Sequence, residues 1–314
     1  MRVRAARLIE HGQPLVVEEV DLPEPSEGEV VVAVAYGGVN PVDRYAALGR
    51  VAPDALLPRT VGSEASGRVD GRPVLVRGHK LGTARDGLWA EKAVVPAAAV
   101  ISLPEGVTLE AAAAMGVAGV TAWRTVTEKA QVGPDDRVLV LGASGGVGSV
   151  AVSVARSLGA TVWGQTGSAE KVDWIRQRGA VEVVVADAAS LAEAARELHP
   201  TVVLDPLGDG YFKAAVELLE PRGRLVLYGT SADPTGEVPL QLLYRKGLTV
   251  FGYGGLIEPD DVLAEHLGVA LQALADGRLE VVVDRVLPLA DVNRAFELLV
   301  DRQVRGKILL DVGA

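Results

Sequence analysis

The residues from Arg137 to Val150, RVLVLGASGGVGSV, form the pattern with the clearest chemical meaning in this sequence. The apolar run Val138 to Gly142 predicts a buried strand, and the small residues at 143–148 predict a turn into an apolar helix. In such a turn, Gly145 would let the backbone approach a pyrophosphate, and Gly148 would let the helix pack on the strand. Free N–H groups at the helix start would attract phosphate. Ordinary strand-to-helix turns can share this pattern, so its context must decide.

The composition is that of a two-domain globular protein. The 314 residues are 49% hydrophobic and 23% charged, with a net charge of -10 and scattered Lys and Arg, which argues against a nucleic-acid partner. We see no apolar run of roughly 18 residues and no signal-peptide centre, so we expect no membrane association and a cytoplasmic location. The absence of cysteine excludes disulfides, thiolate metal sites and a cysteine nucleophile. The four histidines include no i, i+4 pair, so we expect no metal site.

The first 110 residues are predicted to be rich in β-strands. Short runs of β-branched residues alternate with Pro and Gly, which is typical of strands joined by turns. The strands are expected at Val3–Ile9, Leu15–Val20, Glu29–Val39 and Gly67–Val76, and residues 86–91 are expected in another apolar strand.

Polar residues follow the third of these strands, where the chain enters a short helix. Asn40, Asp43 and Tyr45 would lie near a strand end, where binding sites commonly form. Alternatively, Asn40 and Asp43 cap the helix and Tyr45 is half-buried. Glu64 could be a buried carboxylate, but a helix cap or a surface position fits the sequence equally.

The middle of the chain predicts a parallel sheet with crossover helices. A helical pattern from Thr108 to Ala130 precedes regularly alternating strand-like and helix-like runs. Strands are expected at Val138–Gly142, Thr161–Gln165, Glu182–Ala186, Thr201–Asp205, Arg224–Gly229 and Leu248–Tyr253. Helices are expected at Gly146–Leu158, Ala169–Arg178, Ala189–His199, Gly210–Glu220 and Pro239–Arg245. Six strands complete a doubly wound sheet, and a glycine turn after the first strand then predicts dinucleotide binding.

The tail is predicted to rejoin the β-rich domain. Its expected elements are a helix at Pro259–Asp276, a strand at Val281–Leu287, a helix at Leu289–Asp301 and a strand at Lys307–Asp311. We therefore predict a catalytic domain formed by residues 1–112 and 258–314, and a dinucleotide-binding domain formed by residues 113–257.

The second strand of the predicted sheet favours NADP(H) over NAD(H). An acidic residue that would bind the ribose hydroxyls is missing, because Thr166 occupies that position. Ser168, Lys171 and the helix start could instead stabilise a 2′-phosphate, although Glu170 opposes it. The alternative is that Ser168 caps the helix and Lys171 is solvated.

Motifs along nearly the whole chain resemble those of zinc-independent medium-chain dehydrogenases/reductases of the NADPH:quinone oxidoreductase branch. They are VNPVDRY at 39–45, GSEASG at 62–67, GVT at 119–121, ASGGVG at 143–148, GSAEK at 167–171, DPLG at 205–208, GRLVLYG at 223–229 and GK at 306–307. The resemblance implies an α/β fold class: a GroES-like β-rich catalytic domain and a Rossmann domain with a doubly wound, parallel six-stranded sheet. It also implies NADP(H) in the cleft between the domains, and a homodimer or homotetramer commonly paired through residues 248–253.

Carried over by position, the resemblance places Asn40 and Tyr45 beside the nicotinamide. The cofactor-binding residues that it implies are Thr121, Ser144, Gly145, Gly146, Val147, Ser168, Lys171, Gly229, Thr230, Ser231, Phe251, Tyr253 and Lys307. The sequence departs from the zinc-dependent relatives, because Gly62-Ser63-Glu64 replaces their Gly-His-Glu and no cysteine is present. It also has a short segment at 67–73 and Ala186 in place of an aromatic residue near the 2′-phosphate.

The implied activity is zinc-independent hydride transfer from NADPH to a quinone or an α,β-unsaturated carbonyl, a small-molecule acceptor that must already be electrophilic. Tyr45 is the best candidate to hydrogen-bond the acceptor oxygen or relay a proton, with Asn40 fixing its surroundings, and water is the alternative proton source. Two other functions would keep the same motifs: an NADPH-binding redox sensor or structural protein with little turnover, and an enoyl-thioester reductase.

Overall fold

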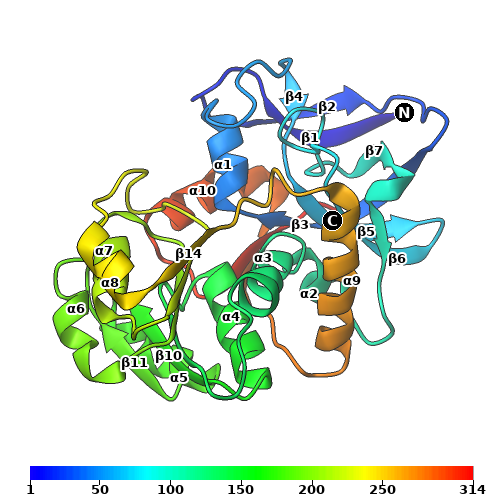
Figure 1. The fold of residues 1–314 in the computed structure, drawn as a ribbon. Helices are drawn as coiled ribbons and strands as arrows, with labels where there is room; N and C mark the ends of the chain where they lie inside the picture. Colours follow the sequence, from blue (N-terminus) through cyan, green and yellow to red (C-terminus); the bar gives the residue numbers. More distant parts are fainter. Residues whose placement is uncertain (314) are drawn as a thin grey trace. The chain divides into compact units, whose positions relative to one another are not determined.

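The computed structural model describes residues 1–313, which form two units (Figure 1). Unit 1 consists of Met1–Val120, Glu258–Ala275 and the described residues from Val281 onward. Unit 2 consists of Thr121–Ile257 and Asp276–Glu280. None of the helices within residues 1–313 has the length and apolar character needed to cross a membrane.

Unit 1 contains two sheets. The larger follows the order β15 (Val283–Pro288), β16 (Lys307–Asp311), β3 (Glu29–Val39), β5 (Glu64–Val69), β6 (Arg72–Arg77) and β8 (Val100–Ser102), and β7 (Lys92–Pro96) also pairs with β3. The smaller follows the order β2 (Val16–Asp21), β1 (Arg2–Leu8) and β4 (Arg59–Thr60). Both sheets contribute to one apolar core, in which Leu8, Val32 and Trp89 are fully buried.

The strand register of the larger sheet determines which polar residues meet. β3 lies between β16 and β5, with Val39 opposite Ile308 and Gly37 opposite Ala65. Because both pairings are antiparallel, the first residues of β16 and β5, Lys307 and Glu64, lie beside the last residues of β3. The sheet therefore brings together residues that are 243 positions apart in the sequence.

Helices complete unit 1. They are α1 (Pro41–Ala47), α2 (Leu109–Ala113), α9 (Asp260–Ala275) and α10 (Val292–Val300), with short 3-10 turns at Ala97–Ala99 and Leu289–Asp291. α3 (Ala118–Arg124) begins in unit 1 and ends in unit 2, and a π-helical turn at Thr125–Lys129 follows it.

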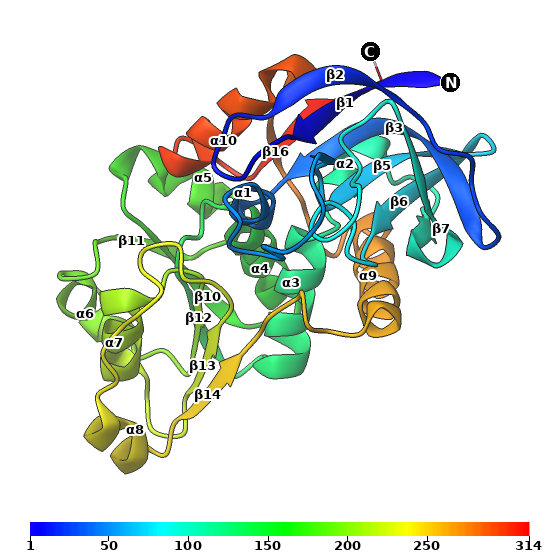
Figure 2. The ribbon, with the colours of Figure 1, turned by 90° about the horizontal axis from the view of Figure 1, so that it is seen from above.

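Unit 2 contains one parallel six-stranded sheet. Its order is β11 (Glu182–Val185), β10 (Thr161–Thr166), β9 (Arg137–Val140), β12 (Val202–Asp205), β13 (Arg224–Leu227) and β14 (Thr249–Gly252). The connecting helices are α4 (Gly146–Ser157), α5 (Val172–Gln177), α6 (Leu191–Ala194), α7 (Asp209–Leu218) and α8 (Leu240–Lys246), with 3-10 turns at Ala169–Lys171 and Arg196–Leu198. α6, α7 and α8 lie on one face of the sheet and α4 on the other (Figure 2). This is the predicted doubly wound architecture.

The sequence-based expectations fail at four places, one of which is the helix expected at Ala189–His199, where only Leu191–Ala194 is α-helical and Arg196–Leu198 is a 3-10 turn. The strand expected at Gly67–Val76 is a hairpin, because Asp70 and Gly71 adopt φ values of 48° and 78° and turn β5 into β6. The helix expected from Thr108 to Ala130 is interrupted between Ala113 and Ala118. Residues 86–91 form no strand apart from one isolated bridge to Ala5.

Candidate functional site

The glycine turn of unit 2 leaves backbone donors free at the start of α4. The first hydrogen bond of the helix runs from the Ser149 N–H to the Gly145 carbonyl at 2.9 Å. The N–H groups of residues 146–148 therefore have no hydrogen-bond acceptor within the helix. A Cβ at Gly148 would lie 2.3 Å from the Gly142 carbonyl oxygen, and Gly142 itself has a φ of +60°. These two glycines let the turn close, and its geometry fits a pyrophosphate.

Gln165 fixes this turn to the neighbouring strands. Its amide oxygen accepts the Gly142 N–H at 2.9 Å, and its amide nitrogen donates to the Ala186 carbonyl at 2.6 Å. Because Gln165 is only 1% exposed, these bonds join the ends of β9, β10 and β11 away from water. Sequence reasoning missed Gln165, although a polar residue inside a buried strand could have signalled it.

The segment after β10 contains the residues predicted to choose the nucleotide. The Ser168 N–H donates to the Thr166 hydroxyl at 3.2 Å, and the Ser168 side chain makes no capping bond. Its hydroxyl bonds to no other described residue and can therefore accept or donate to a ligand. Lys171 is only 7% exposed, so the alternative of a solvated lysine is wrong.

Other predicted cofactor residues surround the ends of β12, β13 and β14. The Ser231 N–H and hydroxyl both donate to the Pro206 carbonyl, at 3.0 and 3.1 Å, and a Cβ at Gly229 would lie 2.8 Å from the same oxygen. Thr230 beside them is exposed. On the last strand Phe251 is half-buried, and buried Tyr253 follows it with its ring 5.5 Å from the Arg124 guanidinium.

Thr121 occupies the middle of α3. It is 7% exposed, and its carbonyl accepts the Thr125 hydroxyl at 2.8 Å. Ser144 in the glycine turn is equally buried, whereas Gly145, Gly146 and Val147 are partly exposed. The turn therefore presents its backbone, rather than large side chains, to the surroundings.

Asp205 and Tyr228 each have a buried polar atom without a hydrogen-bond partner among the described residues. One oxygen of the fully buried Asp205 accepts the Leu207 and Gly208 N–H groups at 2.7 and 3.1 Å, and Oδ2 accepts none from the part of the chain described. Burial raises the pKa of Asp205 to about 6. The buried Tyr228 hydroxyl also lacks a hydrogen bond among residues 1–313, and burial and Asp205 raise its pKa.

A buried polar cluster in unit 1 contains Asn40, Glu64 and Lys307. The Asn40 amide nitrogen donates to Glu64 Oε1 at 2.6 Å. The Lys307 ammonium donates to Asn40 Oδ1 at 2.5 Å, to Glu64 Oε1 at 2.7 Å and to the Val39 carbonyl at 3.0 Å. All three side chains are at most 3% exposed. Glu64 is therefore the buried carboxylate among the alternatives that the sequence leaves open.

Small residues make room for this carboxylate. A Cβ at Gly38 would lie 2.3 Å from Glu64 Oε1, and a Cβ at Gly116 would lie 2.3 Å from Oε2. Oε2 accepts the Val117 N–H at 2.5 Å, immediately before α3. The glycines at these positions are thus required by the close approach of backbone to a buried charge.

Asp43 extends the cluster through backbone donors. Its two oxygens accept the Asn40 N–H at 2.8 Å and the Ser63 N–H at 2.9 Å. Burial, opposed in part by the hydrogen bond from Ser63, raises the pKa of Asp43 to about 6. Asp43 therefore stabilises the start of α1, whereas the Asn40 side chain is bound to Glu64 and Lys307.

Tyr45 lies apart from these contacts. It is half-buried on α1, and its hydroxyl forms no hydrogen bond to any residue between 1 and 313. The structure thus joins Asn40 to Lys307, but it does not join Tyr45 to either.

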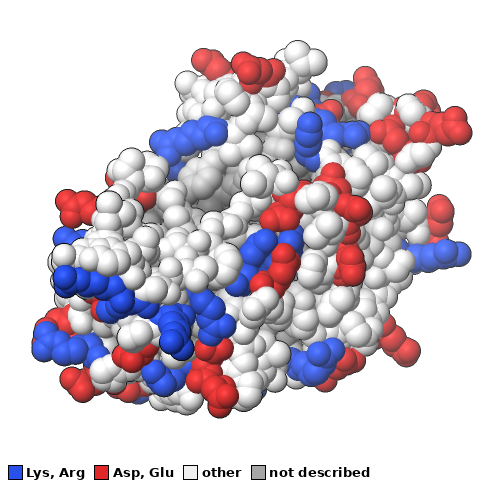
Figure 3. Space-filling view, viewed as in Figure 1, with Lys and Arg blue, Asp and Glu red and all other residues white. Residues whose placement is uncertain are grey.

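No group of three or more His, Cys, Asp or Glu side chains among the described residues could hold a metal ion. On the face drawn in Figure 3, Lys and Arg are interspersed with Asp and Glu.

Comparisons with known proteins agree with this architecture. Residues 146–261 match the family model described as zinc-binding dehydrogenase. A quinone oxidoreductase from Salmonella typhimurium is 31% identical over 96% of this chain and 97% of its own length. A mycobacterial protein solved in complex with NADPH has a TM-score of 0.86 and 28% identity, covering 98% of this chain and 99% of its own. A structure described as an NAD-dependent alcohol dehydrogenase has a TM-score of 0.89 and 28% identity, covering 99% and 100%.

These likenesses extend over both units, and the fold combines a GroES-like β-rich unit with a Rossmann unit. The similar proteins are described by different activities. The likeness therefore supports a nicotinamide cofactor but does not fix the acceptor that it reduces. The chain belongs to the quinone oxidoreductase branch of the medium-chain dehydrogenase/reductase family.

Proposed function

We propose that this protein is an NADPH-dependent oxidoreductase that reduces a quinone or an α,β-unsaturated carbonyl without a metal. The observation that carries the proposal is the glycine turn, with its free N–H groups at the start of α4 and its attachment to Gln165. When bound, NADPH would supply a hydride. The chain itself would hold the pyrophosphate at residues 144–147 and orient the reactants.

The preference for NADPH rests on the end of β10. Thr166 replaces the acid that would bind the ribose hydroxyls, and the Ser168 hydroxyl is available to a phosphate. Lys171 adds a positive charge that is largely shielded from water, where its attraction to a phosphate is stronger than at the surface. We infer that these three residues form the 2′-phosphate site.

The acceptor is proposed from the residues available for catalysis. Without cysteine ligands for a catalytic metal, an electrophilic quinone or enone is favoured over an unactivated ketone. Tyr45 has a hydroxyl that can hydrogen-bond the acceptor oxygen, and Asn40 supplies an amide donor. The remaining candidate cofactor residues, Thr121, Gly229, Thr230, Ser231, Phe251 and Tyr253, are proposed to contact other parts of the cofactor.

Assembly into a homodimer is proposed through β14. This strand ends the sheet order of unit 2, so its outer edge carries no strand partner within the described chain. Val250, Leu256 and Ile257 are exposed along or just after it, and Tyr244 is exposed on α8. An apolar surface beside an open strand edge favours pairing with a second copy, which sedimentation analysis would measure.

One experiment tests the cofactor and the reaction together. We expect NADPH to bind at least about tenfold more tightly than NADH, because a paired phosphate contributes more than about 1.4 kcal/mol. Lys171→Ala should remove most of this preference, whereas Arg176→Ala, in an exposed position on α5, should preserve it. The loss of NADPH absorbance with a panel of quinones and enones measures turnover.

Two results would contradict the proposal. Equal affinity for NADH and NADPH would show that the protein has no 2′-phosphate site at the end of β10. Tight NADPH binding without turnover of any quinone or enone would favour the redox sensor instead.

A further inference from the structure

We infer that Gln165 is a positioning residue that holds the glycine turn of unit 2 in the conformation that binds a pyrophosphate. This inference rests on the proposed function, because it takes residues 142–148 as the pyrophosphate site. It concerns unit 2 alone, and it adds a side chain that lies outside the sequence motifs described above.

Gln165 binds the first two N–H groups of the turn. Its side-chain oxygen accepts the Gly142 N–H at 2.9 Å, and its backbone carbonyl accepts the Ala143 N–H at 3.0 Å. The Gly145 N–H bonds within the turn, to the Gly142 carbonyl at 2.9 Å. The N–H groups of residues 144 and 146–148 donate to no residue of the described chain. These four groups are the donors that remain for an anion.

Gly142 is the residue through which Gln165 acts on these donors. Gly142 has a φ of +60°, and a Cβ at Gly148 would lie 2.3 Å from the Gly142 carbonyl oxygen. The same oxygen accepts the Gly145 N–H. The start of α4 therefore packs directly on Gly142, so a change in the conformation of Gly142 moves the free N–H groups of residues 146–148.

The Gln165 amide has a single orientation. Its nitrogen donates to the Ala186 carbonyl at 2.6 Å, while its oxygen accepts the Gly142 N–H. The reversed amide would place nitrogen against an N–H group and oxygen against a carbonyl. Because β10 lies between β9 and β11, the amide ties the turn after β9 to the segment after β11. Gln165 is 1% exposed, so water does not compete for either bond.

Stability alone does not account for this amide. On burial the amide of Gln165 exchanges its hydrogen bonds to water for two bonds within the protein, so the net gain in stability is small. A buried polar group with all its bonds made does, however, restrain the groups that it joins. This restraint on a turn with free N–H groups is what a positioning residue supplies to a binding site.

The test separates the pyrophosphate from the rest of the cofactor with two small probes. ADP carries two adjacent phosphates and no 2′-phosphate, and adenosine 2′-phosphate carries the 2′-phosphate alone. Calorimetric titration gives the Kd of each probe and of NADP+ for the wild type and for Gln165→Met, which has a similar volume and lacks the amide.

We expect Gln165→Met to lower the affinity for ADP and for NADP+ about tenfold, because the free N–H groups lose their fixed direction. The affinity for adenosine 2′-phosphate should change less than about twofold, because Ser168 and Lys171 remain. A general loosening of this end of the sheet would weaken both probes alike.

A second variant can regain both hydrogen bonds. In Gln165→Glu, a neutral carboxyl can accept the Gly142 N–H and donate to the Ala186 carbonyl, whereas a carboxylate places a negative oxygen against that carbonyl. Burial raises the pKa of a carboxyl at this position, so we expect the neutral form at pH 5. Relative to the wild type at the same pH, the affinity for ADP should be within about threefold at pH 5 and at least about tenfold lower at pH 8. Gln165→Met should remain weak at both pH values.

The control is Thr201→Val, which removes a hydroxyl that donates to Asp136 at 2.7 Å at the opposite end of the same sheet. It should lower the melting temperature, as Gln165→Met does, and leave the Kd of ADP unchanged. An unchanged Kd of ADP in folded Gln165→Met would overturn the inference, and so would equal weakening of ADP and adenosine 2′-phosphate. If Gln165→Met does not fold, binding of ADP by Gln165→Glu that matches the wild type at both pH values would overturn it.

Failure of the proposed function gives different results. Wild-type protein that binds neither ADP nor NADP+ would overturn both the inference and the proposed function. Wild-type protein that binds ADP but not adenosine 2′-phosphate would contradict the 2′-phosphate site alone. Binding of NADPH without reduction of any acceptor would contradict the proposed reaction alone, because the ADP titrations would still decide the role of Gln165.

Discussion

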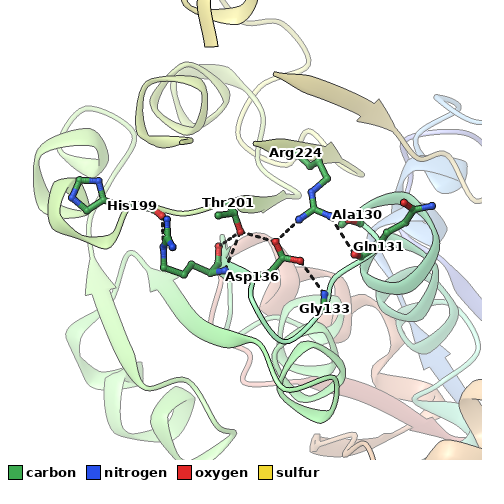
Figure 4. Close-up of polar contacts among 8 residues, drawn as sticks. Ala130, Gln131, Gly133, Asp136, His199, Thr201 and Arg224 are labelled. Carbon is green, nitrogen blue, oxygen red and sulfur yellow. Dashed lines mark hydrogen bonds and ion pairs between the residues drawn. The ribbon is translucent and has the colours of Figure 1, made fainter. Parts of the chain in front are cut away.

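The two ends of the six-stranded sheet in unit 2 differ in how completely their polar atoms are paired. At the amino ends of the strands, the Asp136 carboxylate accepts the Thr201 hydroxyl at 2.7 Å, the Gly133 N–H at 2.9 Å and the Arg224 guanidinium (Figure 4). The same guanidinium donates to the Ala130 and Gln131 carbonyls at 2.5 and 3.2 Å. This network joins the beginnings of β9, β12 and β13.

The carboxyl ends carry the opposite features. There the glycine turn leaves N–H groups free, and Asp205 Oδ2 and the Tyr228 hydroxyl are buried without a hydrogen bond in the described chain. Buried polar atoms are normally paired, so an end that tolerates unpaired ones loses stability. The amino end thus stabilises the sheet, and the carboxyl end gives up stability at the edge where parallel sheets bind ligands.

The largest expected difference in stability is between alanine substitutions at two glycines of the same turn. Gly148→Ala would place a Cβ 2.3 Å from the Gly142 carbonyl oxygen, so it should lower the free energy of unfolding by about 1–3 kcal/mol and also abolish NADPH binding. Gly145→Ala meets the same oxygen only at 3.3 Å. It should leave stability nearly unchanged and lower NADPH affinity at least about tenfold, because it obstructs the pyrophosphate. Urea unfolding and NADPH titration measure the two effects.

Unchanged NADPH affinity in Gly145→Ala would show that the turn does not bind the pyrophosphate of the cofactor. Equal stability of both variants would show that the contact between Gly148 and Gly142 does not limit the fold.

A second difference concerns the pH dependence of stability. The native pKa of Asp205, about 6, lies above its ordinary value of 3.8, so the native state binds this proton more tightly than the unfolded state. The resulting stability is present in full below about pH 4 and is lost as the pH rises through 6. Asp205→Asn stays neutral and its amide oxygen can still accept the Leu207 and Gly208 N–H groups. At pH 8 the variant should therefore be more stable than the wild type, by up to about 3 kcal/mol, and the gain should vanish near pH 4.

The matched substitution at the amino end of the sheet should have the opposite effect on the free energy of unfolding. Asp136→Asn puts an amide where a carboxylate accepts three donors, so we expect it to lower the free energy of unfolding at pH 8 by about 1–3 kcal/mol. Urea unfolding of both variants at pH 5 and pH 8 measures the comparison. Destabilisation by Asp205→Asn at pH 8 would show that the buried carboxylate is stabilising.

The extent to which sequence predicted the fold depends on the kind of signal. The parallel strands of unit 2 were predicted to within two residues at either end, because strands buried on both faces are continuous apolar runs. β3 and β16 have the predicted limits. The hairpin between β5 and β6 was missed because apolar residues flank it closely, although Asp70-Gly71 is a typical turn pair.

The candidate site was less predictable, because its contacts depend on tertiary structure. Asn40 and Lys307 could be named from a family resemblance, but their hydrogen bond exists because β16 pairs with β3. No local pattern indicates that Glu64 lies between them. The same holds for Gln165, whose two bonds require three neighbouring strands to be in register.

The smallest and most direct test removes one hydroxyl at each end of the sheet. The Thr201 hydroxyl donates to Asp136 at 2.7 Å and accepts the Arg137 N–H at 3.0 Å, so Thr201→Val should lower the free energy of unfolding by about 1–2 kcal/mol. The buried Tyr228 hydroxyl has no such bonds to the described chain. Tyr228→Phe should therefore leave stability unchanged or raise it by up to about 1 kcal/mol in protein without NADPH, because it removes an unpaired polar group. Equal destabilisation by both changes, measured by urea unfolding, would mean that the two ends pair their polar atoms alike. Opposite signs would show that the Tyr228 hydroxyl, at the end of the sheet that is proposed to bind NADPH, does not stabilise the fold as the Thr201 hydroxyl does.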